Sequence, residues 1–577
     1  MKKKLLPALI VTGLIILVVI IMGITALINK YTPTKKTEDL KEYFNISSDD
    51  EAALIVDNEL SDYKAKIIDK KIYVDYKFVH DSLNSRFYWD ANENVLLYTT
   101  ASDIISAAAD SNSYSVTKQT NDFGYPIVKA TSDSALIALD YVKQYSNITF
   151  KSYDDPARIV ITSKWDEIDS ATVSNSTQIR VKGGIKSPIL KEVKKDDKIT
   201  ILDSGDKWDK VATEDGVIGY IKGKALSESK KTKLTNPDYE EETFTHIKKD
   251  KDICLAWNQV TSQSANSKVP QVISSTKGIN VMSPTWFYLN DNNGNLADIA
   301  SKDYVSYCHS QGIEVWGLFS NLENTDVDAA YVLTHTSTRT TLINQIMSAA
   351  FNYELDGVNI DFENITEAAY GDSYIEFIRE LAIKCHNNGI SLSVDVTVPA
   401  SFNKFFNRSD MANFADYIVI MGYDEHYKGS DAGSVSSIPW VTEGVESTLK
   451  EVPADQIILG MPFYTRIWEL TPKEDDDAVT DTEDQSKYTV ASQVYSMDAA
   501  AAQLATNNAT AALDEESGQN YAEWSVSNKL YKVWLEDTTS LEKRLKLVDD
   551  NKLAGAAFWK LGFENSSVWD TVIKYLD

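Results

Sequence analysis

The segment with the clearest chemical pattern is LDGVNIDFEN, residues 355–364, in which polar and apolar residues alternate after a tight Asp-Gly turn. Successive side chains of a strand point to opposite sides, so Asn359, Asp361 and Glu363 share one face and the apolar residues between them share the other. The alternative interpretation is an ordinary amphipathic strand whose polar face meets water. We disfavour it because crowded carboxylates raise one another's pKa values, which serves a general acid and does nothing for a solvated strand.

These residues resemble the signature D-G-x-D-x-D-x-E of glycoside hydrolase family 18, which lies on the fourth strand of a TIM barrel. The resemblance covers roughly residues 244–577. One departure is Asn359, which stands where the family usually has its first inner Asp and is similar to the branch of spore-germination and cortex-lytic N-acetylglucosaminidases. The resemblance implies a retaining glycosidase in which the acetamido oxygen of the substrate attacks, so that a single catalytic acid is enough.

The resemblance also implies roles for individual residues and requires no metal or other cofactor. Glu363 is expected to protonate the glycosidic oxygen, with its pKa raised by burial and by Asp361, while Asp361 orients the 2-acetamido group. Tyr423 is expected to hydrogen-bond the acetamido oxygen, and Trp559 to stack under the sugar. The other expected substrate contacts are Met421 and Asp424 of the M-x-Y-D motif, Trp286, Tyr464 and Arg466, of which the last three could equally be packing residues.

Asn359 has its own consequence for the acid–base chemistry. An Asp at this position would titrate as a coupled pair with Asp361. An amide removes that coupling, and we expect it to donate a hydrogen bond to Asp361 that keeps this carboxylate ionised. The competing interpretation is that Asn359 only fills space in the barrel.

The last 330 residues alternate apolar runs with helical stretches such as 304–308 and 374–385. This alternation predicts a parallel sheet, and eight such units close as an α/β (β/α)8 TIM barrel. A doubly wound open sheet is the alternative, disfavoured because no Gly-rich phosphate loop follows the first run. The eight predicted strands are 253–257, 279–289, 313–319, 358–362, 390–398, 417–421, 457–461 and 555–559.

The chain is multidomain, and two smaller domains are expected before the barrel at 244–577. Residues 46–168 form an α+β domain with an internal duplication that resembles the N-terminal domain of copper amine oxidases, without a His cluster for copper. Residues 172–228 contain short β runs similar to a bacterial Src-homology-3-like barrel, which serves either as a spacer or as a wall-peptide binder. Residues 229–243 have no apolar period and are expected to be a linker.

The N-terminus predicts a single-pass membrane protein. Residues 1–4 carry three lysines and are expected to stay cytoplasmic, and residues 5–28 contain no charge and can span a bilayer core of about 30 Å. Residues 29–45 are expected to form a stalk that leads to an extracytoplasmic catalytic domain. A signal peptide cleaved after Ala26 is the alternative.

Composition and cysteine content narrow the possible partners. A net charge of −28 disfavours binding to nucleic acid, which needs clustered Lys and Arg. Cys254, Cys308 and Cys385 are too dispersed for a zinc pattern and are expected to be buried thiols. The acidic stretch 473–487 is expected to be a solvated loop, with a cation site as the less favoured alternative.

The expected partner is therefore a polysaccharide, and we expect the protein to act as a monomer. On an outward-facing, membrane-tethered enzyme the leading substrate is peptidoglycan, with chitin second. The alternative to an enzyme is a sugar-binding protein with the same barrel, disfavoured because Glu363 is retained.

The N-terminal pattern generates a testable prediction. Protease added to intact cells should remove the large domain, because residues 31–577 lie outside while residues 5–28 hold the protein in the membrane. Recovery of a chain that begins near residue 27 in the culture medium would instead demonstrate a cleaved signal.

Overall fold

The computed structural model describes residues 5–363, 365–473 and 484–576. They form two compact units. The first comprises Met1–Trp89, Ala107–Tyr114 and Thr120–Glu241, and the second comprises Asp90–Ser106, Ser115–Gln119 and Glu242–Asp577.

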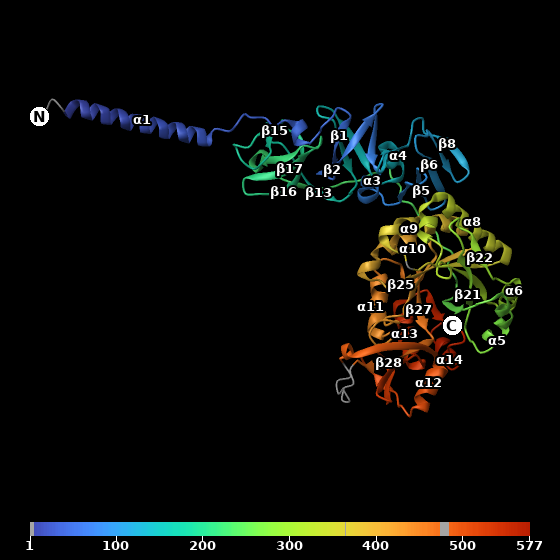
Figure 1. Cartoon of the computed structure of the whole chain (residues 1–577). Coiled ribbons are helices and arrows are strands. Elements are labelled where there is room, and N and C mark those ends of the chain that lie inside the picture. Colours follow the sequence, from blue (N-terminus) through green and yellow to red (C-terminus); the bar gives the residue numbers. More distant parts are fainter. Residues whose placement is uncertain (1–4, 364, 474–483, 577) are drawn as a thin grey trace. The chain divides into compact units, whose positions relative to one another are not determined.

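Eight parallel strands close into a barrel in the second unit (Figure 1). β20 pairs with β21 on one side and with β33 on the other, which closes the ring, and β22 (Leu296–Asp298) adds an antiparallel strand to β21. The prediction of a (β/α)8 barrel is confirmed, and the open doubly wound sheet is excluded. The barrel strands are β20 (Ile253–Asn258), β21 (Val281–Leu289), β23 (Glu314–Ser320), β24 (Gly357–Asp361), β25 (Ser391–Thr397), β26 (Tyr417–Met421), β27 (Ile457–Pro462) and β33 (Gly555–Trp559).

Alternate residues of each strand supply two apolar layers. The interior of the barrel holds a cluster that includes Leu255, Trp257 and Trp316. The outer faces pack against the helices, as where Phe362 stacks on Phe377 at 5.5 Å between ring centroids. The surrounding helices are α5 (Val269–Ile273), α6 (Lys302–Ser310), α7 (Ala329–Thr334), α8 (Thr336–Tyr353), α9 (Glu367–His386), α10 (Arg408–Phe414), α11 (Ile438–Thr448), α13 (Thr538–Asn551) and α14 (Val568–Val572).

Cys254, Cys308 and Cys385 are free, buried thiols within this unit, as the sequence predicted. Burial raises the pKa of Cys254 and of Cys308 to about 12. Both thiols therefore stay protonated and behave as small apolar side chains.

A second sheet is inserted between β27 and α13, which the sequence analysis had assigned wholly to the barrel. Its five antiparallel strands follow the order β29-β28-β32-β31-β30. Trp468, which is fully buried, anchors its core and donates a hydrogen bond from Nε1 to the carbonyl of Gly433 (2.8 Å). The elements are β28 (Tyr464–Pro472), β29 (Tyr488–Ser496), α12 (Met497–Thr506), β30 (Ala512–Asp514), β31 (Gln519–Val526) and β32 (Lys529–Leu535). Most of the acidic stretch 473–487 lies outside the described residues.

Each of the two segments expected to be copies contains a helix followed by two strands, α3-β4-β5 and α4-β11-β12. The copies enter different sheets: β11 and β12 belong to the order β11-β12-β1-β2-β3-β10-β9, whereas β4 and β5 begin the order β4-β5-β6-β7-β8. The elements are α2 (Leu40–Tyr43), β1 (Glu51–Val56), β2 (Glu59–Ile68), β3 (Lys71–Asp75), α3 (Tyr76–Ser82), β4 (Phe87–Asp90), β5 (Val95–Thr99), β6 (Ile104–Ala108), β7 (Ser113–Val116), β8 (Gln119–Asp122), β9 (Val128–Ala130), β10 (Ala135–Ala138), α4 (Leu139–Tyr145), β11 (Thr149–Tyr153) and β12 (Arg158–Thr162).

Residues 90–106 join the second unit although the sequence places them in the duplicated domain. Asp90 accepts hydrogen bonds from the backbone N–H (2.7 Å) and the hydroxyl (2.6 Å) of Thr336, where α8 begins. A carboxylate at a helix N-terminus satisfies unpaired N–H groups and the helix dipole. This contact explains why the segment groups with the barrel.

The small all-β domain forms a sheet in the order β15-β14-β18-β17-β16-β13-β19, in which β14 to β18 lie within the expected range 172–228 and β13 and β19 add a strand from either side of it. β19 lies within the expected linker 229–243 and pairs with β13. Phe44, from the end of the expected stalk, and Ile55 of the α+β part share one apolar core with Val173, Ile179 and Val211, so the two small domains fold as one body within the first unit. The strands are β13 (Glu167–Thr172), β14 (Thr177–Arg180), β15 (Ile189–Val193), β16 (Lys198–Asp203), β17 (Trp208–Thr213), β18 (Ile218–Lys222) and β19 (Lys230–Lys233).

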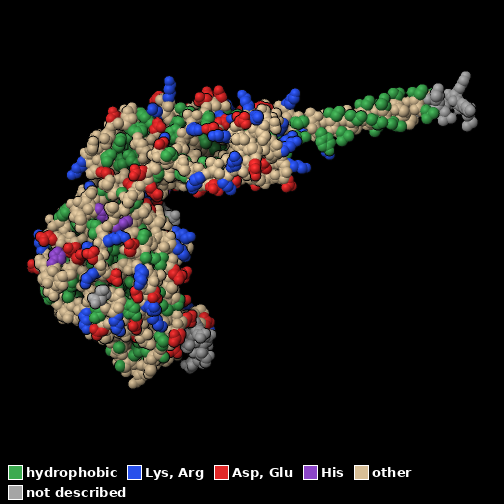
Figure 2. All heavy atoms as spheres, turned by 180° about the vertical axis from the view of Figure 1, so that it is seen from behind, with side chains coloured by type: hydrophobic (Ala, Val, Ile, Leu, Met, Phe, Trp, Pro, Cys, Tyr) green, Lys and Arg blue, Asp and Glu red, His purple; other side chains and the backbone are tan. Residues whose placement is uncertain are grey.

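The helix α1 (Leu5–Tyr31) extends three residues beyond the expected span and presents apolar side chains along its length (Figure 2). Among the described residues it is the one helix long and apolar enough to cross a membrane, a property that signal sequences share. On the face drawn in Figure 2, acidic and basic side chains are interspersed over the rest of the molecule.

Candidate active site

A cavity of about 480 Å³ lies at the carboxyl ends of the barrel strands. Active sites of (β/α)8 barrels form at this end because the loops after the strands converge there. The lining residues are Trp257, Asp361, Glu363, Asp395, Thr397, Val398, Pro399, Ala400, Phe402, Met421, Tyr423, Asp424, Glu425, Tyr427, Trp440 and Trp559.

Six of the ten residues singled out in the sequence meet in this cavity, and a seventh, Asn359, is fully buried on β24, the strand that ends at Asp361. Three do not line it: Trp286, Tyr464 and Arg466. The six that line it are Asp361, Glu363, Met421, Tyr423, Asp424 and Trp559.

Trp286 is a core residue, which contradicts its expected sugar contact. The side chain is fully buried, stands edge-on to Tyr304 and donates from Nε1 to Asn266 Oδ1 (2.8 Å). The reason is strand alternation: Ser283, three positions earlier on β21, bonds to Asn359 in the interior, whereas Trp286 lies on the side that packs against the helices.

Tyr464 and Arg466 act on the cavity through Asp424. The Tyr464 hydroxyl donates a hydrogen bond to Asp424 Oδ1, and the Arg466 guanidinium lies 3.6 Å from the same oxygen. Asp424 has a φ of 61°, in the left-handed region that few non-glycine residues occupy. The two side chains therefore hold an acidic residue in a constrained backbone conformation at the cavity wall.

Glu363 is fixed by its backbone. Its N–H donates to Asn321 Oδ1 (2.8 Å), and Asn321 Nδ2 donates to the Glu363 carbonyl (2.8 Å), so the loop after β23 clamps the residue after β24. Burial raises the pKa of Glu363, followed by the charges of Asp424 and Glu323. The sequence had assigned that electrostatic contribution to Asp361.

Asp361 lies deeper than Glu363. Burial raises its pKa well above the ordinary value, and the charges of Glu363 and Glu323 raise it further. Its Oδ1 atom is buried and has no hydrogen-bond partner among the described residues. A buried oxygen without a partner is costly, so this atom is available to a proton or to a ligand donor.

Asn359 is completely hydrogen-bonded, and Asp361 is not among its partners. Its Oδ1 accepts from Trp257 Nε1 (3.0 Å) and Ser283 Oγ (2.9 Å). Its Nδ2 donates to Ser393 Oγ (3.0 Å) and Asp395 Oδ1 (2.7 Å). Both amide hydrogens are thus engaged, and the expectation that Asn359 bonds to Asp361 is wrong.

Aromatic rings form the remaining wall of the cavity. Trp257 stands edge-on to Trp559 (6.0 Å between centroids) and to Tyr423 (6.4 Å). Burial raises the pKa of Tyr423 well above its ordinary value, and the charge of Asp361 adds to this. Tyr423 therefore remains a neutral hydroxyl that can donate a hydrogen bond.

Comparison with known proteins assigns this arrangement to a family. The profile of "Glycosyl hydrolases family 18" matches residues 319–564, which contain both carboxylates, Tyr423 and Trp559. The barrel is a family 18 glycosidase domain.

Relatives of this family 18 domain cover about half of the chain. "Uncharacterized glycosylase YvbX" of Bacillus subtilis is 24% identical over 302 residues, which span 49% of this chain and 81% of the relative. "Cortical fragment-lytic enzyme" of Bacillus subtilis is 24% identical over 287 residues, spanning 48% and 63%. The chain thus spans less than two thirds of the second relative.

Two solved structures share the fold. The spore cortex-lytic enzyme SleL of Bacillus cereus aligns with a TM-score of 0.50 and 18% identity, over 60% of this chain and 77% of that one. The C-terminal domain of a putative chitinase from Desulfitobacterium hafniense also aligns with a TM-score of 0.50 and 18% identity, over 57% and 100%.

Several lining residues of the family 18 cavity escaped the sequence analysis. Asp395 lies inside the predicted strand 390–398, between Val394 and Val396, and an acid between two apolar residues of a strand was the available signal. Phe402 (77% exposed) lies in a short 3-10 helix and Tyr427 (58% exposed) in a loop, and neither segment has an apolar period that would separate a sugar-stacking ring from any other surface aromatic. Trp257 and Trp440 complete the aromatic lining.

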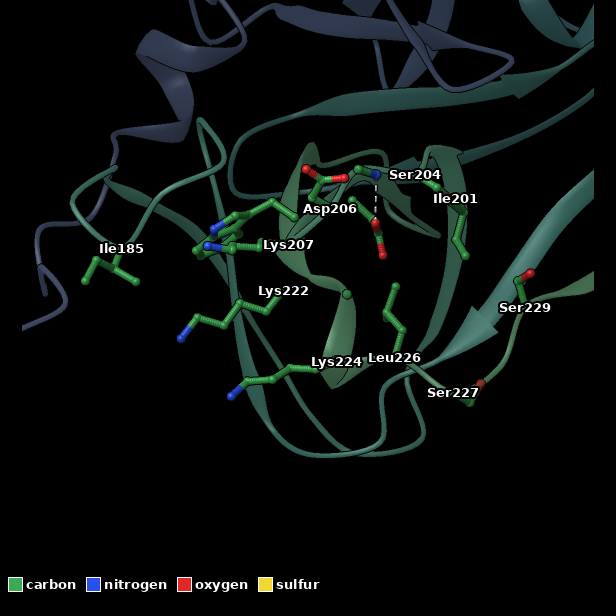
Figure 3. Close-up of a pocket in the computed structure, with 14 residues that line it drawn as sticks. Ile185, Ile201, Ser204, Asp206, Lys207, Lys222, Lys224, Leu226, Ser227 and Ser229 are labelled. Atoms are coloured by element: carbon green, nitrogen blue, oxygen red, sulfur yellow. Dashed lines mark hydrogen bonds between the residues drawn. The ribbon is translucent and has the colours of Figure 1, made fainter. Parts of the chain in front are cut away.

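A larger hollow of about 700 Å³ lies on the small all-β domain (Figure 3). Lys207, Lys222 and Lys224 line it, together with Trp208. Its buried carboxylate, Asp209, accepts a hydrogen bond from the N–H of Gly205 (3.1 Å) and so supports the turn before β17. The family 18 cavity differs from this hollow in holding Asp361 and Glu363, two carboxyl groups whose pKa values burial raises.

The first prediction from this geometry concerns Glu363. Glu363→Gln should lower hydrolysis by about 10² or more, because the amide keeps the shape but gives no proton. Since its pKa is raised, wild-type activity should persist to higher pH than an ordinary glutamic acid allows, and fall as the pH rises through that value. Rate–pH profiles with circular dichroism as a fold control measure both effects; wild-type turnover by the variant would exclude Glu363 as the acid.

The second prediction concerns Asn359. Asn359→Ala should lower the free energy of unfolding by about 3 kcal/mol, because four buried partners lose a hydrogen bond, and should lower activity more than Asn359→Asp. Asn359→Asp keeps both acceptor contacts but faces Asp395 with a second carboxylate, so it should mainly reshape the pH–rate profile. Equal, small effects of both substitutions, with unchanged profiles, would reduce Asn359 to a space-filling residue.

Proposed function

We propose that this chain hydrolyses β-linked N-acetylglucosamine glycans with retention of configuration, using the substrate's acetamido group as nucleophile. The observation that carries the proposal is the pair of half-buried carboxylates, Asp361 and Glu363, in a cavity walled by Tyr423 and Trp559. A 2-acetamido group supplies the nucleophile that this site needs beside a single acid.

Glu363 gives its proton to the glycosidic oxygen as the bond to the leaving sugar breaks. Its raised pKa keeps the proton in place at the start of the reaction. After the leaving sugar departs, the Glu363 carboxylate accepts a proton from water, which attacks the oxazolinium intermediate. Both steps use one side chain, which the Asn321 clamp holds in position.

The 2-acetamido group is held by three side chains. Asp361 accepts a hydrogen bond from the acetamido N–H and balances the positive charge of the oxazolinium. Tyr423 donates its hydroxyl hydrogen to the acetamido oxygen, and its raised pKa keeps that hydrogen in place. Trp559 supports the apolar face of the sugar ring. Asp424 and Met421 complete the wall of the subsite, with Asp424 held by Tyr464 and Arg466.

The substrate we propose is cell-wall peptidoglycan. Relatives at 24% and 26% identity bear the names "Cortical fragment-lytic enzyme" and "Putative sporulation-specific glycosylase YdhD". The apolar helix α1 supports a tethered, extracytoplasmic catalytic domain, which would meet the wall polymer directly. We propose a monomer anchored through this helix at the cell membrane.

Chitin is the second candidate substrate. It shares the acetamido sugar that the mechanism needs, and one relative is named "Probable di-N-acetylchitobiase 2". Phe402 and Tyr427 at the cavity are exposed rings on which either glycan could stack.

One experiment tests substrate and mechanism together. Full-length protein in detergent is incubated with purified peptidoglycan and with chitin oligomers, new reducing ends are identified by mass spectrometry, and the first anomer is read by proton NMR. We expect N-acetylglucosamine reducing ends from peptidoglycan, initially as the β-anomer, and inhibition by a GlcNAc-derived thiazoline. Cleavage of chitin alone would transfer the assignment to chitin, and an initial α-anomer would exclude the substrate-assisted mechanism.

A further inference from the structure

Asp395 is a buried carboxylate that lines the active cavity and has no role in the mechanism above. It lies on β25, next to the strand that carries Asp361. Residues pair in parallel register as Asn359 with Ser393 and Ile360 with Val394, so the next level brings Asp361 beside Asp395. Neighbouring strands are about 4.8 Å apart, and side chains at one level of a barrel share a face.

The contact with Asn359 shows which way the Asp395 side chain points. Asn359 Nδ2 donates to Asp395 Oδ1 at 2.7 Å, so the carboxylate points into the barrel interior, toward the face of β24 that also carries Asp361. A charged acceptor and an amide donor make a strong, directional hydrogen bond that favours the ionised form of Asp395. Position 359 itself carries no charge in this chain, and the carboxylate beside it comes from Asp395 on the neighbouring strand β25.

Among the described residues no cation forms an ion pair with Asp361 or Asp395. Asp395 is 2% exposed, and the groups that influence its pKa are Asp361, Glu363 and Asn359. Tyr374 of α9 and Tyr423 after β26 also feel its charge, and both are neutral phenols. Within the described chain neither Asp361 nor Asp395 has an ion-pair partner, in contrast to Asp424 with Arg466.

Two carboxylates in this position cannot both stay ionised at small cost, so they retain one proton between them. The Asn359 hydrogen bond stabilises negative charge on Asp395 and leaves the proton on Asp361. Burial raises the pKa of both carboxyl groups well above the ordinary value; for Asp395 the charge of Asp361 adds to this and the hydrogen bond from Asn359 opposes it.

We propose that Asp395 is the proton partner of Asp361, a positioning residue on β25 that replaces the carboxylate missing at position 359. The proposal rests on the proposed function for its role in turnover. As positive charge develops on the acetamido group, the proton passes from the Asp361 carboxyl to the Asp395 carboxylate, and Asp361 becomes the anion that faces the oxazolinium. The pair keeps one proton and one negative charge throughout, and the proton returns to Asp361 when the product sugar forms.

The test compares four full-length proteins in detergent: wild type, Asp395→Asn, the double variant Asn359→Asp with Asp395→Asn, and Ser391→Ala. Asp395→Asn is isosteric and still accepts a hydrogen bond from Asn359, so a purely structural Asp395 tolerates it. The double variant returns the carboxylate to β24. Ser391 is the matched control, a buried β25 residue whose hydroxyl has no hydrogen-bond partner among the described residues.

Two measurements are made across pH: kcat/KM on a nitrophenyl diacetylchitobioside, and the infrared band of protonated carboxyl groups. Removing the Asp395 charge lowers the pKa of Asp361, since a neighbouring negative charge raises it. We expect Asp395→Asn to lower kcat/KM about 10²-fold, with the alkaline limb and the loss of the carboxyl band both moving to lower pH. The double variant should have a kcat/KM about tenfold higher than that of Asp395→Asn, with the carboxyl band back at its wild-type pH position. Ser391→Ala should match wild type in both measurements.

The proposal is overturned if Asp395→Asn keeps the wild-type profile and band. The proposal is also overturned if kcat/KM falls in Asp395→Asn while the alkaline limb of the rate–pH profile and the infrared carboxyl band keep their wild-type pH positions, and the double variant recovers no activity. Thermal unfolding checks that each variant is folded. If Asp395→Asn is unstable, the double variant still allows the test, because it keeps one Asp and one Asn at the contact between positions 359 and 395. If the wild-type protein cleaves no glycan, the proposed function is rejected. The infrared band is measured without substrate, so it still tests whether Asp361 and Asp395 share a proton.

Discussion

The hydrogen-bonded amide of Asn359 is the interaction on which the interior of the barrel depends. Through Trp257, Ser283, Ser393 and Asp395 it joins residues of β20, β21 and β25 to β24. An amide suits this place because it offers two donors and an acceptor without a charge. Buried polar networks of this kind stabilise a structure when every member has a partner, and here all four amide hydrogen bonds are made.

Around this amide the chain concentrates negative charge that it does not neutralise. Asp361, Glu363 and Asp395 line one cavity, and the charge of Glu323 raises the pKa of both Asp361 and Glu363. Elsewhere in the barrel the protein pairs its buried acids, as with Arg339 and Glu380 or Arg544 and Glu536. Acids paired with Arg stay ionised and serve the structure. The unpaired acids of the cavity have raised pKa values, so they can hold a proton and transfer it.

Rigid elements hold this chemistry in place on two sides. The loop after β23 clamps the backbone of Glu363 through Asn321, and the inserted sheet contributes Tyr464 and Arg466 to fix Asp424. Two of the residues first assigned to the sugar thus position a wall of the cavity instead. The inserted sheet contributes to the cavity because its first strand, β28, begins at Tyr464, which bonds to Asp424.

The sequence by itself determined the barrel, its eight strands and the chemical face of β24, because alternation and period are local properties of the chain. Spacing alone places Asp361 and Glu363 on one face of this segment, whereas the roles expected of them come from the family resemblance. Tertiary structure decided everything that depends on which strands become neighbours. The register of β24 with β25 brings Asp395 beside Asp361, the outward side of β21 takes Trp286 into the core, and ring closure brings Trp257 to Asn359. The Asn359 contacts with β25 and β20 join residues 34 and 102 positions apart, and local sequence patterns carry no information about such pairs.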